Sequence, residues 1–189
     1  MASYSVTIFC GSSPGADPLY VQGAADLGAG LAEAGMSLVF GGGNVGLMGV
    51  VAGSALRAGA HVTGIIPDFL RQREVEFPGL SELIVTDSMH TRKRRLFALG
   101  DAFVVLPGGL GTFDETFEIM TWKQLGRHDK PIILVDLLGW AQPFVALITH
   151  TVAQGFARPS AAALFEVQPD IPSVLARLAA LRGTSDCGR

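Results

Sequence analysis

Short apolar runs recur along this chain, and longer segments with a helical pattern of apolar and polar residues separate them. The runs are rich in β-branched residues and lack polar alternation, as is typical of strands that are buried on both faces of a sheet. Strands are therefore predicted at Ser5–Cys10, Ser37–Phe40, His61–Ile66, Glu82–Thr86, Ala102–Leu106 and Pro131–Val135.

The segments between the predicted strands place apolar residues at the spacing of an amphipathic helix. Because strand and helix alternate throughout, the pattern predicts an α/β fold with a Rossmann-like, doubly wound parallel sheet. Helices are predicted at about Pro18–Ala34, Leu47–Ala58, Arg92–Leu99, Thr112–Leu125, Pro143–Gln154 and Ile171–Leu181.

The chain has 189 residues, which is the length of one domain and enough to bury a core. We expect residues 1–182 to form that single domain and residues 183–189 to be a disordered tail. The one sizeable polar excursion, from Arg71 to Pro78, is predicted to be a loop near the edge of the sheet.

Composition narrows the possible partners. The formal net charge of −3 argues against a broad surface for nucleic acid or an anionic membrane. No apolar run approaches the roughly 20 residues of a membrane span. Cys10 and Cys187 lie in a core strand and the tail, so no disulfide is expected and the cytoplasm is the predicted compartment. The histidines show no metal-ligand spacing and the two cysteines are far apart in the sequence, so no metal is expected.

Three of the predicted strands end in glycine-rich turns, which begin at Cys10, Gly41 and Pro107. In doubly wound sheets, ligands bind outside the carboxyl ends of the strands. The three turns are therefore predicted to meet along one edge of the sheet and to form the binding site there.

The turn from Pro107 to Gly111 lies between a predicted strand and a predicted helix. Such a turn presents backbone N–H groups at the positive end of a helix dipole, which is suited to a phosphate. Glu115 adds a carboxylate that a bare phosphate cradle does not need, and this favours catalysis. The structural alternative is a capping box, in which Glu115 bonds the N–H of Thr112.

The second turn, Gly41 to Gly46, has the spacing G-x-G-x-x-G of a dinucleotide fingerprint. That fingerprint belongs in the first strand-to-helix turn, and here it follows the second strand. The pattern fits a smaller nucleotide, bound close to the backbone, better than it fits a dinucleotide. The alternative is a tight turn with a purely structural role.

A basic run, His90 to Arg95, stands out in this acidic protein. Successive helical residues are about 100° apart, so only one or two of these side chains can face a ligand. Arginine is suited to bidentate recognition of phosphate or carboxylate, and the remaining basic residues are expected on the surface.

Together these motifs resemble the LOG (Lonely Guy) family of cytokinin riboside 5′-monophosphate phosphoribohydrolases. The pattern P-G-G-x-G-T-x-x-E is matched in full at Pro107 to Glu115, and M-H-x-R-K is matched from Met89 to Lys93. Shorter matches include Phe9 to Ser13 and Thr121 to Gly126, so the resemblance runs from about Val6 to Leu181.

The resemblance implies hydrolysis of the N-glycosidic bond of an N6-prenylated or plain adenosine 5′-monophosphate, in a single nucleotide-binding domain and without a cofactor. It assigns Arg92 and Glu115 as the catalytic pair, while Asp114 replaces a more common glutamate. It also implies a homodimer whose partner completes the site. The residues expected to bind the substrate are Gly42, Gly43, Glu74, Lys93, Gly108, Gly109, Leu110, Gly111, Thr112, Phe113, Asp114 and Thr121.

One alternative function stays open, and one former label of the family does not fit this chain. Molybdenum-cofactor carrier proteins are similar in fold, so a non-catalytic nucleotide or cofactor carrier is the alternative function. The family's former label, lysine decarboxylase, would require pyridoxal phosphate on a lysine, and this chain has only Lys93, Lys123 and Lys130. The candidates for a pocket that holds a prenyl group are Met89, Phe113, Met120 and Trp122.

Overall fold

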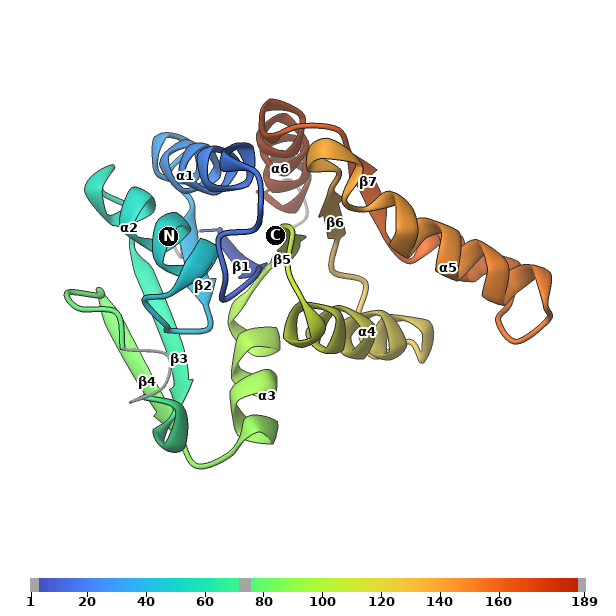
Figure 1. Ribbon diagram of the computed structural model, residues 1–189, viewed down its shortest axis with the longest axis horizontal. Helices are drawn as coiled ribbons and strands as arrows, with labels where there is room; N and C mark the ends of the chain where they lie inside the picture. Colours follow the sequence, from blue (N-terminus) through green and yellow to red (C-terminus); the bar gives the residue numbers. More distant parts are fainter. Residues whose placement is uncertain (1–3, 72–75, 187–189) are drawn as a thin grey trace.

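A seven-stranded parallel sheet forms the centre of the fold, with the strand order β4-β3-β2-β1-β5-β6-β7 (Figure 1). The computed structural model describes residues 4–71 and 76–186. The strands are β1 (Ser5–Phe9), β2 (Ser37–Phe40), β3 (Val62–Pro67), β4 (Glu82–Thr86), β5 (Ala102–Val105), β6 (Ile132–Val135) and β7 (Glu166–Gln168).

Helices cover both faces of this sheet, as expected for a doubly wound fold (Figure 1). One face packs against α1 (Pro18–Glu33), α2 (Gly46–Arg57) and α6 (Ile171–Asp186). The other face packs against α3 (Met89–Leu99), α4 (Leu110–Gln124) and α5 (Gln142–Ala153). The predicted α/β class and parallel sheet are confirmed.

The central strand β1 shows why the strands carry no polar alternation. Val6 and Ile8 belong to the core beneath α1 and α2, whereas Phe9 belongs to the core on the opposite face. Successive side chains of a strand point to opposite faces, and here both faces are covered by helices. Even the one polar residue between them, Thr7, is fully buried, and its hydroxyl donates to the Leu96 carbonyl at 2.8 Å.

All six predicted strands and all six predicted helices are present, with ends that differ by a few residues. Strand β7 was not predicted because its three residues, Glu-Val-Gln, offer no apolar run. Helix α6 continues to Asp186, so residues 183–186 of the predicted tail are helical instead. Residues 183–186 contain no proline, so nothing in them interrupts the hydrogen bonds of the helix. The last three residues lie outside the described part of the chain.

A histidine fastens the loop between α4 and β6. The backbone N–H of Lys130 donates to Nδ1 of His128 at 3.1 Å, so Nδ1 carries no proton. Nε2 of the same ring lies 2.9 Å from the Ile119 carbonyl and donates to it. Burial lowers the pKa of His128, which agrees with a neutral ring in this position.

The order of the strands places a crevice at the centre of the molecule. The chain moves from β1 outward to β4 on one side, then returns to β5 on the other side of β1. Neighbouring loops separate at such a switch point, and ligands bind there at the carboxyl ends of the strands. The turns that follow β1, β2 and β5 all lie at this edge.

Candidate active site

Hydrogen bonds between backbones join the three glycine-rich turns. The N–H of Gly11 donates to the Pro107 carbonyl at 3.0 Å, and the N–H of Leu47 donates to the Gly11 carbonyl at 3.0 Å. Gly46 has φ +54°, and a Cβ there would overlap the backbone of Ser12. Only glycine allows this approach of α2 to the first turn. The predicted convergence of the three turns is confirmed.

Helix α4 begins directly at the third turn and points its first N–H groups into a cavity of about 140 Å³. Gly109 is the N-cap, and no side chain caps the helix. The first N–H groups of a helix have no acceptor within the helix, and the dipole makes this end positive. The turn therefore presents an anion-binding surface. The residues of this turn that line the cavity are Gly109, Leu110, Gly111 and Thr112.

Thr112 strengthens the anion-binding character of the turn. Its side chain is only 3% exposed, and its hydroxyl has no hydrogen-bond partner among the described residues. A buried hydroxyl without a partner is costly, and a phosphate oxygen in the cavity would satisfy it. A capping box would need Thr112 at the N-cap. Because the helix already begins at Leu110, that alternative for Glu115 is wrong.

Arg92 reaches the cavity from the first turn of α3. It is only 5% exposed. Its Nε donates to the Ile65 carbonyl at 3.1 Å, and its Nη2 donates to the Gly41 carbonyl at 3.0 Å. These carbonyls lie in β3 and just after β2, so the edge of the sheet fixes the plane of the guanidinium. A Cβ at Gly41 would overlap Nη2, which explains the glycine there.

Glu115 lines the same cavity one helical turn after Thr112. Its negative charge acts on the thiol of Cys10, which also lines the cavity. Burial and then the charge of Glu115 raise the pKa of the Cys10 thiol far above its usual range. The thiol therefore stays protonated, which excludes Cys10 as a thiolate nucleophile at neutral pH.

Lys93 joins the two helices that carry Arg92 and Glu115. Its Nζ lies 2.7 Å from a carboxylate oxygen of Asp114 and 3.7 Å from one of Glu118. The side chain of Lys93 is 17% exposed, so these ion pairs are partly shielded from water. These two ion pairs hold α3 against α4 at the level of the cavity, next to the predicted catalytic residues.

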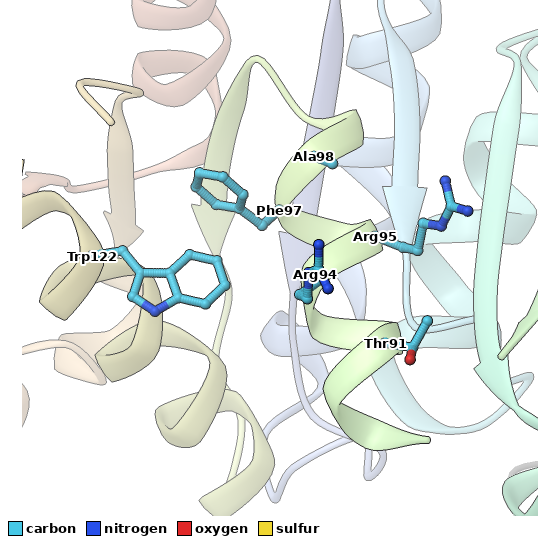
Figure 2. Close-up of a pocket in the computed structure, with 6 residues that line it drawn as sticks. All are labelled: Thr91, Arg94, Arg95, Phe97, Ala98 and Trp122. Atoms are coloured by element: carbon cyan, nitrogen blue, oxygen red, sulfur yellow. The ribbon is translucent and has the colours of Figure 1, made fainter. Parts of the chain in front are cut away.

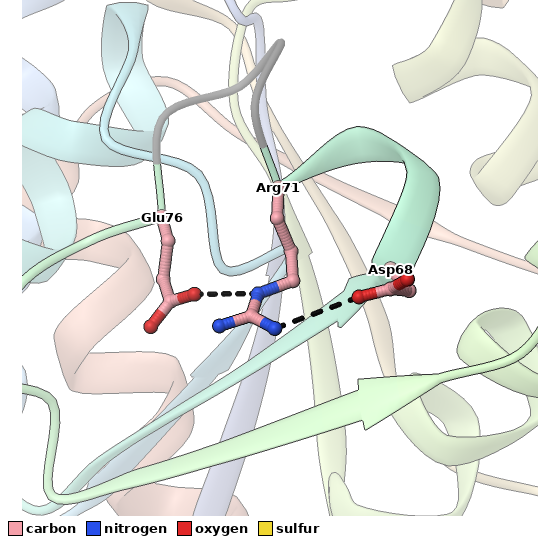
Figure 3. Close-up of polar contacts among 3 residues, drawn as sticks. All are labelled: Asp68, Arg71 and Glu76. Carbon is pink, nitrogen blue, oxygen red and sulfur yellow. Dashed lines mark hydrogen bonds and ion pairs between the residues drawn. The ribbon is translucent and has the colours of Figure 1, made fainter.

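Gly42 and Gly43 support a neighbouring segment. The N–H of Phe77 donates to the Gly42 carbonyl at 3.0 Å, and Gly43 forms an isolated antiparallel bridge with Glu76. Glu76 also accepts a bond from Nε of Arg71 at 2.7 Å, and Asp68 lies 3.5 Å from the same guanidinium (Figure 3). Predicted residue Glu74 lies outside the described residues.

Other predicted residues lie away from this cavity. Phe113 stacks on Trp140 at 5.5 Å with nearly parallel rings, so it offers the site no side chain. Thr121 is exposed and lies roughly 13 Å along α4 from Thr112, with its hydroxyl bonded to the Phe117 carbonyl. Of the four candidates for a prenyl pocket, Met120 is buried in the core, and Trp122 faces Phe97.

The structure also adds residues that the motifs did not single out. Ser12 and Met48 line the cavity with Arg92 and Glu115, and the carbonyl of Gly41 anchors Arg92. Ser12 lies in the first glycine-rich turn, so the position of that turn at a strand end was the available signal. Gly41 begins the second such turn and carries the same signal, whereas the role of Met48 depends on how α2 approaches the sheet.

Two further features are absent from the residues that the structure describes. Among them, no three side chains of His, Cys, Asp or Glu are grouped so that they could hold a metal ion. No helix formed by these residues combines the length and the apolar character needed to cross a membrane.

Comparison with known proteins identifies a family that this chain matches and solved structures that share its fold. The model of a family described as "Possible lysine decarboxylase" matches residues 48–178. The cytokinin riboside 5′-monophosphate phosphoribohydrolase of Rhodococcoides fascians is 42% identical over 175 residues, which are 92% of this chain and 88% of that protein. A protein of the same description from Arabidopsis thaliana is 39% identical over 170 residues, covering 90% of this chain and 80% of its own.

Solved structures with less sequence similarity share the fold. The molybdenum cofactor carrier protein of Chlamydomonas reinhardtii is 19% identical to this chain and has a TM-score of 0.74. The alignment covers 96% of this chain and 99% of that chain. DNA processing protein A of Helicobacter pylori is 16% identical, with a TM-score of 0.59 over 93% of this chain and 80% of that one. These likenesses concern the arrangement of strands and helices alone.

Proposed function

This chain belongs to the family described as "Possible lysine decarboxylase", whose members include proteins named cytokinin riboside 5′-monophosphate phosphoribohydrolase, and from this membership we propose its reaction. The chain hydrolyses the N-glycosidic bond of an adenosine 5′-monophosphate, N6-prenylated or plain. The products are the free base and ribose 5-phosphate. The observation that carries the proposal is the cavity in which Glu115 and Arg92 adjoin the anion-binding start of α4.

The 5′-phosphate binds at the turn from Gly109 to Thr112. The free N–H groups of the first helical turn and the buried Thr112 hydroxyl supply donors, and the helix dipole favours the negative charge. Interactions with a group remote from the reacting bond supply binding energy that positions the ribose. The proposal therefore requires a strong preference for the monophosphate over the nucleoside.

Glu115 carries the chemistry at the other end of the ribose. Cleavage of an N-glycosidic bond passes through an oxocarbenium-like sugar, and a carboxylate beside C1′ stabilises its positive charge. The same carboxylate accepts a proton from the attacking water as general base. Arg92, held by two backbone carbonyls, presents its guanidinium to the ribose and its phosphate in a fixed orientation.

The lysines of the chain do not support a decarboxylase. Schiff-base chemistry on pyridoxal phosphate needs a lysine that faces the site. Lys93 pairs with Asp114, Nζ of Lys123 donates to the Lys130 carbonyl, and Nζ of Lys130 donates to the Phe97 carbonyl. A carrier function rests on likeness of fold alone and gives no role to Glu115.

We also propose a homodimer that forms through the exposed side of α4. Leu110, Phe117 and Leu125 are 87%, 37% and 67% exposed and fan over one side of this helix. Beside them, a groove of about 570 Å³ lies between α3 and α4, where Trp122 faces Phe97 and where Arg94 and Arg95 also line the space (Figure 2). Because Leu110 also borders the catalytic cavity, a second copy on this side would complete the site. Size-exclusion chromatography that shows only monomer would contradict this arrangement.

The proposed compartment is the cytoplasm. Cys10 is a free, buried cysteine beside Glu115, and a thiol at a catalytic cavity persists best in a reducing environment. Fractionation of cells that produce the protein tests this assignment, which fails if the protein collects outside the cytoplasmic fraction.

Chromatography of reaction products tests the function. The purified protein is incubated with N6-isopentenyladenosine monophosphate, adenosine monophosphate and the nucleoside N6-isopentenyladenosine. Free base is expected from the monophosphates and not from the nucleoside. Glu115→Gln should abolish turnover and leave nucleotide binding intact.

Glu118→Gln is the matched control, because Glu118 lies one turn further along α4 and pairs with Lys93 outside the cavity. This variant should keep most of the activity. If no substrate yields free base, or if Glu115→Gln keeps near-normal turnover, the proposed chemistry is wrong.

A further inference from the structure

A second cavity lies on the other side of the anion-binding turn. It measures about 230 Å³ and shares Gly11, Ser12 and Gly109 with the cavity that holds Glu115. Neither cavity alone reaches the roughly 300–1,000 Å³ of a typical small-molecule site, and the two together do. The proposed phosphate position therefore lies at the junction of two spaces, of which the ribose and base of a mononucleotide use one.

Two aromatic side chains line this second cavity. Tyr20 enters from the first turn of α1, and its ring lies against Gly15, where a Cβ would come within 2.7 Å of it. Trp140 enters from the segment that follows β6. The N–H of Ala141, the next residue, donates to Asp136 at 2.8 Å, which fixes the backbone beside Trp140.

Trp140 is supported from behind by further rings. It stacks on Phe113 at 5.5 Å, with an angle of 2° between the rings, and Phe113 stacks on Phe144 at 6.1 Å. A ring held this way loses little freedom when a ligand packs against its open face. Trp140 is therefore a rigid aromatic surface at the second cavity.

The chemistry of the lining limits what can bind. Among the described residues that line the second cavity there is no Lys, Arg or His, so nothing there attracts a further run of phosphates. It is lined by two aromatic residues, by glycines and two serines, and by the apolar residues Pro14, Leu47 and Pro107. This combination is suited to a flat, uncharged ring that is joined to the ribose phosphate by a short bridge.

We propose that this chain binds dinucleotides, in which a 5′–5′ diphosphate links the nucleoside at Glu115 to a second flat ring between Tyr20 and Trp140. The substrate phosphate and its bridged neighbour lie at the start of α4. The second nucleoside occupies the cavity beyond it. The inference uses the proposed function only for the position of the first phosphate.

The test compares diadenosine diphosphate with AMP, ADP and ATP as ligands of the intact protein, by calorimetry and by competition against AMP hydrolysis. Stacking of one base on an aromatic side chain corresponds to about tenfold or more in affinity. The dinucleotide should therefore bind about tenfold more tightly than ADP, whereas ATP should gain nothing over ADP. Equal affinities for the dinucleotide and ADP would overturn the proposal.

Variants of the two rings separate stacking from structural effects. Trp140→Leu and Tyr20→Leu should each remove most of the dinucleotide's advantage and leave hydrolysis of AMP unchanged. Tyr20→Phe is the matched control and should retain the advantage, because the ring persists. Trp140→Phe should also bind the dinucleotide, but without the tryptophan quenching expected in the wild type. If both leucine variants bind the dinucleotide as the wild type does, the cavity is not its site.

The two proposals fail in different ways. A protein that hydrolyses AMP but shows no preference for the dinucleotide keeps its proposed function and loses this inference. A protein that binds the dinucleotide through Trp140 but releases no base from any monophosphate loses the proposed reaction and keeps the second binding cavity.

Discussion

Gly108 is the point at which the anion-binding turn tolerates the least change. A Cβ at this position would overlap the Thr112 hydroxyl and would come within 2.7 Å of Thr112 Cβ and 2.8 Å of the Gly11 nitrogen. None of these atoms is the end of a flexible side chain. Thr112 is 3% exposed, and the N–H of Gly11 is bonded to Pro107. Gly108→Ala must therefore separate the turns that follow β1 and β5.

The cost follows from overpacking in a region without free space. Forcing an extra carbon into a packed site destabilises by about 1–3 kcal/mol. For a chain of this length each 1 kcal/mol corresponds to roughly 2–4 °C in Tm. The variant should therefore melt about 2–12 °C below the wild type. Loss of the Thr112 hydroxyl bond to a charged phosphate, worth about 1.5–3 kcal/mol, should lower kcat/KM for AMP by roughly 10- to 150-fold.

Gly111→Ala is the control within the same turn. A Cβ at Gly111 meets no atom within 4 Å, and alanine favours the helix that Gly111 belongs to. Its Tm should equal or slightly exceed that of the wild type. Its KM for AMP should rise, because the new methyl group projects beside the N–H groups that bind phosphate.

Thermal unfolding and steady-state kinetics of the Gly108→Ala and Gly111→Ala variants test this reasoning. The reasoning is refuted if Gly108→Ala melts and turns over as the wild type does. It is also refuted if both variants lose the same stability, since their surroundings differ so much.

Three further predictions concern side chains around the site. Lys93→Met should lower the free energy of unfolding by about 0.5–1 kcal/mol in urea, because the Lys93–Asp114 contact at 2.7 Å joins α3 to α4. It should also change kcat more than KM. Lys93→Arg should restore most of the activity. Burial lowers the pKa of His128 below the ordinary value of about 6.5, so its contribution to stability is complete above that pH and is lost as the pH falls towards the lowered pKa. Unfolding free energies between about pH 7 and pH 5 should show this slope, and His128→Gln should flatten it. In a Cys187→Ser background, Cys10 should resist alkylation in the folded protein and react on unfolding; rapid labelling of the native protein would contradict its burial.

Much of the site was predictable because it depends on strand ends. Parallel strands bring their carboxyl ends to one edge, so the turns beginning at Cys10, Gly41 and Pro107 had to converge there once the alternation of strand and helix was recognised. Arg92 and Glu115 follow such ends closely in sequence, at the starts of α3 and α4. Their meeting in one cavity needed only that both helices begin at that edge.

Other features depend on contacts between segments that lie far apart in the sequence. Thr112 followed by Glu115 has the pattern of a capping box, and only the backbone shows that the helix begins two residues earlier. The three residues of β7 form a strand because β6 offers them hydrogen bonds. Phe113 and Met120 have similar apolar character in the sequence, yet one stacks on Trp140 and the other lies in the core.

The sequence by itself determined the α/β sheet, the edge at which the turns meet and the two residues of opposite charge that line the cavity there. These follow from local periodicity and from glycine, whose conformations are properties of short segments. The tertiary structure decided how Gly41 and Ile65 hold Arg92, how Lys93 joins α3 to α4, and that a second aromatic cavity adjoins the phosphate turn. Such features need side chains that are distant along the chain to pack against one another, and packing is set by the whole fold.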